Sequence, residues 1–273
     1  MSLDRRTSFG EDAELYDRIR PGYPDPLFDD LAAITGLREE ARVLEVGCGT
    51  GQATLPLARR GFRVLAVELS ATLAEVARRN HRAFPRVEVV VGAFEEMPAP
   101  PEPFELVLAA TALHWADPSI RFRKVAEILR SEGWVAVLHT HHVAGGTTAF
   151  FEESQQYYRR FFPESSVGFR LPRAEDVPRV GADLAGSGMF GPAIARSYPW
   201  EQRYATADYL DLLRTYSDHR SLGPDRREEL LTRLGTMIDE RFSGEVRKAY
   251  LTVLSVARKV DPAIGAGASH PRG

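Results

Sequence analysis

Hydrophobic and polar positions in the first half of the chain predict strands that alternate with helices. Continuous apolar runs of strand length, bounded by turn residues, predict strands at 41–46, 62–67, 87–91, 104–109 and 134–139. Apolar positions recurring every three or four residues predict helices at 25–37, 53–60, 71–80 and 118–129. This alternation indicates a largely parallel sheet covered on both faces, the doubly wound α/β class.

The alternation stops near residue 140, and the second half of the chain has a different pattern. It predicts an aromatic-rich helix, two further helices and two strands, at 147–162, 207–216, 225–241, 193–204 and 246–260. Residues 15–26 predict a short helix and a turn, because their prolines cannot continue a helix. We expect one domain over 1–273, with a core at about 40–140, cap insertions and C-terminal strands at about 141–260, and a disordered tail at 262–273.

Composition restricts the class of protein and its partners. The 273 residues are 44% hydrophobic and 27% charged, as in ordinary soluble globular proteins. A formal net charge of −3 provides no positive field for nucleic acid. No run reaches the roughly 18 apolar residues of a membrane span. The single cysteine, Cys48, excludes an internal disulfide and fits the cytoplasm. We therefore expect a cytoplasmic protein with neither nucleic acid nor membrane as a partner.

A glycine cluster follows the first predicted strand. Residues Glu45 to Gly51 place glycines at i, i+2 and i+4, whereas a dinucleotide-binding turn places them at i, i+2 and i+5. The Glu45 carboxylate suits a cation better than a pyrophosphate. Glu68 ends the second strand, where a carboxylate can accept both hydroxyl hydrogens of a ribose. The pattern predicts a nucleoside with a cationic substituent, a description that S-adenosylmethionine meets.

This loop, together with Glu68, resembles motif I of the class I S-adenosylmethionine-dependent methyltransferases, over roughly residues 40–140. The segments 109–115 (Ala-Ala-Thr-Ala-Leu-His-Trp) and 16–24 resemble the type 11, trans-aconitate methyltransferase-like branch. The resemblance implies a seven-stranded Rossmann-like sheet, S-adenosylmethionine as cofactor and S-adenosylhomocysteine as product. Ala93 stands where the family commonly has an aspartate. The implied cofactor-binding residues are Glu45, Gly47, Cys48, Gly49, Thr50, Gly51, Glu68, Leu69, Ala93, Phe94 and Ala110.

Methyl transfer from a sulfonium is an in-line displacement, so the protein mainly aligns the reactants and excludes water. His114 could take a proton from a phenol or an acidic carbon, and a carboxylate acceptor needs no base. We expect Trp115, Tyr16, Arg20 and Tyr23 to contact the acceptor. Purely structural roles for these five side chains remain open.

Three histidines crowd the end of the fifth predicted strand. His139 and His141 would share one strand face, with His142 on the other. The run has no carboxylate to complete a metal site, so we expect no metal.

These observations predict a methyltransferase acting on an oxygen or carbon atom of a small organic molecule, such as a carboxylate or a planar metabolite. A monomer or homodimer is expected. Two alternatives stay open: an NAD-type oxidoreductase, which Gln52 and Glu45 both disfavour, and a protein that binds S-adenosylmethionine without turnover.

Overall fold

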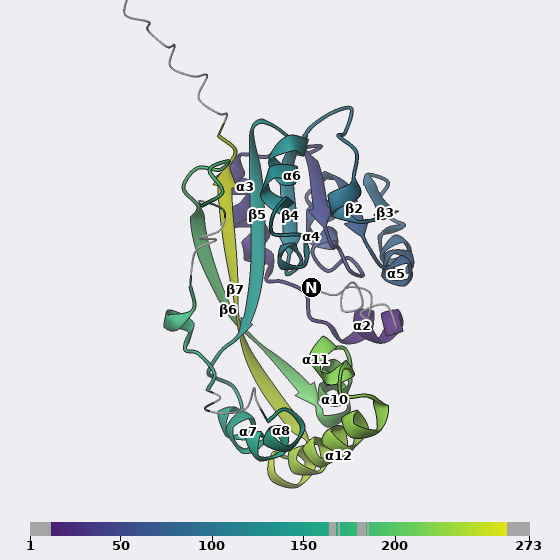
Figure 1. Ribbon diagram of the computed structural model, residues 1–273, viewed down its shortest axis with the longest axis vertical. Coiled ribbons are helices and arrows are strands. Elements are labelled where there is room, and N and C mark those ends of the chain that lie inside the picture. The colour runs from purple at the N-terminus through teal and green to yellow at the C-terminus, as the bar shows by residue number, and fades with distance from the viewer. Residues whose placement is uncertain (1–11, 164–167, 169, 179–183, 185, 261–273) are drawn as a thin grey trace, which may run out of the picture.

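A seven-stranded sheet with strand order β3-β2-β1-β4-β5-β7-β6 forms the centre of the computed structural model (Figure 1). The structure describes residues 12–260 except 164–167, 169, 179–183 and 185, so the predicted tail at 262–273 lies outside the described residues. The seven predicted strands are confirmed as β1 (Arg42–Val46), β2 (Arg63–Glu68), β3 (Val87–Val91), β4 (Phe104–Ala110), β5 (Leu129–His142), β6 (Ile194–Ala205) and β7 (Glu245–Arg258).

The strands β1 to β5 pair in parallel, and β7 runs antiparallel between β5 and β6. The chain leaves β1 toward β2 on one side and returns to β4 on the other side. At such a switch point, the connections after neighbouring strands diverge and leave a crevice at the carboxyl ends of the strands. The fold therefore directs the glycine loop after β1 and the segment after β4 to the same edge of the sheet.

Helices cover both faces of the sheet, as predicted. The helices α3 (Asp25–Thr35), α4 (Thr54–Arg59) and α5 (Ala71–His81) contribute to one hydrophobic core, and α6 (Arg121–Ile128) contributes to a second. The Ser70 hydroxyl accepts a hydrogen bond from the amide of Leu73 and caps α5, as its place before the helix predicts. These contacts pack the helices against the sheet.

A helical cap forms beyond the core, because β5, β6 and β7 continue past the other strands (Figure 1). These three strands have 14, 12 and 14 residues. The sequence predicts only 134–139 for β5, but antiparallel pairing with β7 continues to His142. The cap contains α7 (Thr148–Glu153), α8 (Gln155–Phe161), α10 (Thr206–Arg214), α11 (Ser217–Arg220) and α12 (Pro224–Arg241). Aromatic side chains of α7 and α8 belong to a third core with α10 and α12.

The single helix predicted at 147–162 is two helices, α7 and α8, that meet at Ser154. The Ser154 hydroxyl donates a hydrogen bond to the carbonyl of Phe151. A serine hydroxyl bonded to a nearby carbonyl competes with the helix ladder, which explains the interruption.

The short helix α2 (Ala13–Ile19) joins the cap to the core. Arg18 pairs with Asp208 and Asp211 of α10, while Glu14 pairs with Arg79 of α5. The N-terminal segment, residues 12–24, thereby lies between the cap and the sheet (Figure 1). Within the described residues, no helix has the length and apolar character to cross a bilayer.

Candidate functional site

A cavity of about 630 Å³ lies between the carboxyl ends of β1, β2 and β4 and the cap. This volume is typical of small-molecule sites, which span roughly 300–1,000 Å³. Residues from the glycine loop, the N-terminal segment, the segment after β4 and the cap all line it. The cavity therefore occupies the switch-point crevice where doubly wound sheets bind their ligands.

The glycine loop forms one wall of this cavity through Gly47 and Gly49. Both residues have left-handed backbone conformations, with φ of +68° and +59°. A Cβ atom at Gly47 would lie 2.6 Å from the Cβ atom of Ala112. The close approach to the segment after β4 thus requires glycine at this position.

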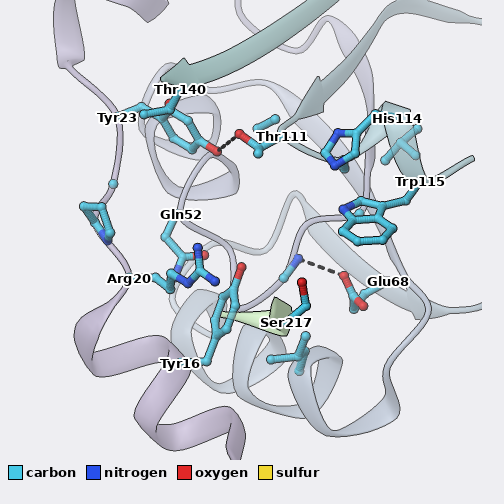
Figure 2. Close-up of a pocket in the computed structure, with 18 of the residues that line it drawn as sticks. Tyr16, Arg20, Tyr23, Gln52, Glu68, Thr111, His114, Trp115, Thr140 and Ser217 are labelled. Atoms are coloured by element: carbon cyan, nitrogen blue, oxygen red, sulfur yellow. Dashed lines mark hydrogen bonds between the residues drawn. The ribbon is translucent and has the colours of Figure 1, made fainter. Parts of the chain in front are cut away.

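The Glu68 carboxylate at the end of β2 holds the loop in place and also lines the cavity. Its Oε2 accepts a hydrogen bond from the Gly49 amide at 2.9 Å (Figure 2). Its Oε1 accepts one from the Ser70 amide, also at 2.9 Å. The residue is 7% exposed. A carboxylate oxygen has two lone pairs, so it can accept more than one hydrogen bond. The geometry suits a ligand with two neighbouring hydroxyl groups.

Eleven of the sixteen predicted site residues line the cavity. They are Tyr16, Arg20, Tyr23, Gly47, Gly49, Glu68, Leu69, Phe94, Ala110, His114 and Trp115. Phe94, in the 3₁₀ turn η2 (Phe94–Glu96), is buried in a hydrophobic core and also borders the cavity. The structure brings together these residues from five separate parts of the sequence.

The other five predicted residues, Glu45, Cys48, Thr50, Gly51 and Ala93, are not among the lining residues. Glu45 is buried behind the loop, where its carboxyl accepts a hydrogen bond from the Thr54 hydroxyl at 2.6 Å. Burial, with a smaller contribution from the neighbouring Glu68 carboxylate, raises the pKa of Glu45 to about 8, although the Thr54 hydrogen bond acts in the opposite direction. Glu45 is therefore placed to order the loop rather than to face a ligand's cation.

Cys48 and Gly51 are both packed inside the protein near the glycine loop. Burial affects the thiol of Cys48. This burial raises the pKa of the Cys48 thiol well above its usual range. The thiol therefore stays protonated and is not suited to nucleophilic attack. Gly51 packs against His81, since a Cβ atom there would lie 2.0 Å from the His81 Cε1. Both residues contribute to packing around the loop.

The N-terminal segment forms the wall opposite Glu68 and Trp115 (Figure 2). The Arg20 guanidinium lies over the rings of Tyr16 and Tyr216, 5.0 and 4.7 Å from their centroids. It also donates a hydrogen bond to the carbonyl of Thr215 at 2.9 Å. The Tyr23 hydroxyl contacts the Thr111 hydroxyl at 3.3 Å. These contacts connect the segment to both the cap and the end of β4.

His114 and Trp115 occupy the 3₁₀ turn η3 (Leu113–Trp115) after β4, with ring centroids 5.0 Å apart. Partial burial lowers the pKa of His114 below 6.5, and the nearby His139 and Arg121 lower it further. His114 is therefore neutral at pH 7 and can accept a proton. Thr111, just before this turn, has a left-handed φ of +55°, an uncommon conformation that often occurs at functional sites.

Sequence reasoning missed one wall of the cavity, the sheet face formed by the extended strands. Trp200 of β6 and His142 of β5 both lie opposite Tyr250 of β7 in register, so the three share one face. Lys248, two residues before Tyr250, shares that face, and all four side chains line the cavity. The signal in the sequence was a lysine inside an apolar strand, one of only three lysines in the chain.

The predicted alternation of the three histidines is confirmed. His142 faces the main cavity, whereas His139 and His141 lie on the other side with ring centroids 6.2 Å apart. The His139 ring is 6.3 Å from the His114 ring, and both line a smaller cavity. The described part of the chain contains no group of three metal-ligating side chains.

The strand order, the switch-point cavity and the glycine loop tied to Glu68 together define a Rossmann-like class I methyltransferase fold. Residues 43–133 match a family model described as a methyltransferase domain. An uncharacterised methyltransferase of Mycobacterium tuberculosis is 36% identical over 130 residues, 48% of this chain and 51% of that protein. Over this segment the chain is similar to S-adenosylmethionine-dependent methyltransferases. It spans about half the length of the curated relatives it matches.

Solved structures have the same fold. A protein of Anaeromyxobacter dehalogenans described as a type II methyltransferase gives a TM-score of 0.57 at 24% identity, over 88% of this chain and 97% of that one. The phosphoethanolamine N-methyltransferase 2 of Haemonchus contortus was solved with phosphomonomethylethanolamine and S-adenosylhomocysteine. It gives a TM-score of 0.53 at 17% identity, over 95% of this chain and 59% of that one.

Proposed function

We propose that this protein transfers the methyl group of S-adenosylmethionine to an oxygen or carbon atom of a small organic acceptor. The observation that carries the proposal is the Glu68 carboxylate, which ends β2, holds the glycine loop and lines the cavity. The family match and the Haemonchus contortus structure, which contains S-adenosylhomocysteine, support the same cofactor.

The residues present fit this cofactor. Glu68 would accept hydrogen bonds from the ribose hydroxyls, and the backbone at Gly47 and Gly49 would permit close approach of the ligand. Leu69 and the Phe94 ring border the cavity beside Glu68 and would pack on the adenine base. When bound, S-adenosylmethionine supplies an electrophilic methyl group on a sulfonium sulfur.

Side chains on the remaining walls would position the acceptor and shield it from water. Trp115 and Tyr16 provide flat apolar surfaces, and Arg20 offers a cation for a carboxylate of the cofactor or acceptor. Neutral His114 can hold a proton released by a phenol or an acidic carbon. Alignment and exclusion of water are the main contributions that this reaction requires of a protein.

Thermal unfolding with separate additions of S-adenosylmethionine, S-adenosylhomocysteine and NAD tests the cofactor. At ~100 times its dissociation constant, a true ligand stabilises the fold by about 2.7 kcal/mol. Stabilisation by NAD alone would instead support an oxidoreductase. Incubation with methyl-labelled S-adenosylmethionine and panels of small carboxylates and phenols then tests turnover. Cofactor binding without transfer to either panel would support a non-catalytic binding protein.

A further inference from the structure

A buried cation, Lys248, lies next to the cap and has no role in the cofactor and acceptor contacts proposed above. Lys248 of β7 is 5% exposed, yet its side chain borders the cavity. Its Nζ donates a hydrogen bond to the Tyr216 hydroxyl at 2.8 Å and lies 5.1 and 5.2 Å from the ring centroids of Tyr216 and Tyr250. Two tyrosine rings and one hydroxyl thus form its immediate surroundings.

Among the described residues, no carboxylate forms an ion pair with Lys248. Asp218 also lines the cavity, but its side chain is 66% exposed and its Oδ1 pairs with the His219 Nδ1 at 2.9 Å. The described part of the protein supplies one hydrogen-bond acceptor, Tyr216, for the three donors of the ammonium group. A buried charge with so few partners is costly unless a ligand completes its surroundings.

Three aromatic groups near Lys248, those of Tyr250, Tyr204 and His142, do not supply a negative charge. Burial raises the pKa of Tyr250, and burial raises the pKa of Tyr204 to about 12, so both phenols are neutral at pH 7. Burial alone would raise the pKa of Tyr216, but the Lys248 ammonium and the Arg20 guanidinium outweigh it and lower that pKa. Burial, and then Lys248, lower the pKa of His142 to about 2, so this imidazole is neutral.

Flat aromatic surfaces lie beside this cation. The rings of Trp200 and Tyr250 stack with centroids 4.5 Å apart, and both border the cavity. The His142 ring lies 6.2 Å from the Tyr250 ring, and its Nε2 is buried with no hydrogen-bond partner among the described residues. The surroundings therefore combine a cation, planar stacking surfaces and an unpartnered imidazole nitrogen.

We propose that Lys248 and the Tyr216 hydroxyl form an anion-binding subsite that anchors the carboxylate of a planar organic acid, the acceptor. This inference rests on the proposed function, because it places the acceptor in the same cavity as the cofactor. The carboxylate would accept hydrogen bonds from the ammonium group and neutralise it. The planar part of the acid would lie against Trp200 and Tyr250, which orients the acceptor.

Titration of benzoate and of its neutral analogue benzamide into the full chain tests the subsite, with and without saturating S-adenosylhomocysteine. We expect benzoate to bind at least tenfold more tightly than benzamide. Lys248→Met should lose at least tenfold in benzoate affinity, about 1.4 kcal/mol, and keep its affinity for S-adenosylhomocysteine. Lys248→Arg, which keeps the charge, should retain part of the benzoate affinity. The matched control is Lys259→Met, because Lys259 does not line the cavity.

Two further measurements separate binding from a structural role. Without ligand, Lys248→Met should unfold at a temperature equal to or above that of the wild type, because it removes an unpaired buried charge. The ultraviolet difference spectrum between the wild type and Tyr216→Phe at pH 7 should show the absorption of a neutral phenol, which means that Tyr216 carries no negative charge.

Four results would each overturn the subsite: equal binding of benzoate and benzamide, no benzoate binding, wild-type benzoate affinity in Lys248→Met, or a phenolate signal from Tyr216, which would already neutralise Lys248. Loss of S-adenosylhomocysteine binding alone, with selective benzoate binding intact, would contradict the proposed function and not the subsite.

Discussion

Replacing Glu68 by glutamine should weaken both the fold and the cofactor site. The carboxylate accepts hydrogen bonds from two backbone amides, those of Gly49 and Ser70, each at 2.9 Å. A glutamine has one acceptor oxygen, so its NH₂ group would face one of these N–H donors. Glu68→Gln keeps the size of the side chain and removes the charge and one acceptor.

The magnitude follows from these two hydrogen bonds. A hydrogen bond to a charged group contributes about 1.5–3 kcal/mol, and a neutral one about 1 kcal/mol. Losing one bond and neutralising the other should lower the free energy of unfolding by roughly 2–5 kcal/mol. The affinity for S-adenosylhomocysteine should fall at least tenfold, about 1.4 kcal/mol, because the ribose also loses an acceptor.

Urea unfolding and isothermal titration of S-adenosylhomocysteine measure the two effects separately. Glu45→Gln is the matched control, since it makes the same change at a buried glutamate in the neighbouring strand β1 that does not line the cavity. Its affinity for S-adenosylhomocysteine should stay within about threefold of wild type, under about 0.7 kcal/mol. The reasoning is refuted if Glu68→Gln unfolds within about 1 kcal/mol of wild type and binds the ligand equally well.

Three further predictions concern pH and packing. The pKa of Glu45 is near 4.5 in the unfolded chain and about 8 in the folded protein. The free energy of unfolding of the wild type, relative to that of Glu45→Gln, should therefore fall as the pH rises from 4.5 to 8. A difference from urea unfolding that stays constant across this range would contradict the prediction. Gly51→Ala should destabilise the fold more than Gly36→Ala, by more than about 1 kcal/mol in urea unfolding, because both glycines have positive φ but only the Cβ at Gly51 meets His81; equal losses would exclude the clash. If His114 accepts a proton, kcat/KM should be constant down to pH 6.5 and fall below it, since the pKa of His114 is lowered; a profile unchanged in His114→Gln would exclude this role.

Local patterns in the sequence predicted most of the sheet and its helices. The strand–helix alternation predicted five strands, and a serine directly before α5 caps that helix, because capping depends on adjacent residues. The break at Ser154 was missed, because it arises from a side-chain hydrogen bond within a continuous apolar pattern. The length of β5 was underestimated, because its final residues are held by pairing with β7, which is distant in sequence.

The same distinction holds for the site: residues close in sequence were predicted, and residues brought together by distant pairing were missed. Glu68 and the glycine loop are close in sequence, and their spacing indicated a shared pocket. The placement of Glu45 was different from that expected, because its position beside the loop does not show which side of the strand its carboxyl occupies. Lys248 was missed, because only the three-strand register brings it to the cavity. The cytoplasmic location, single-domain organisation and oligomeric state stay predictions.

A crystal structure of the protein with S-adenosylhomocysteine tests the central claim most directly. The account predicts the ligand in the cavity beneath the N-terminal segment, with its ribose hydroxyls at about 2.5–3.0 Å from the Glu68 carboxylate oxygens. It also predicts the backbone at Gly47 and Gly49 in contact with the ligand. A ligand bound elsewhere, or one whose ribose does not contact Glu68, would contradict the account.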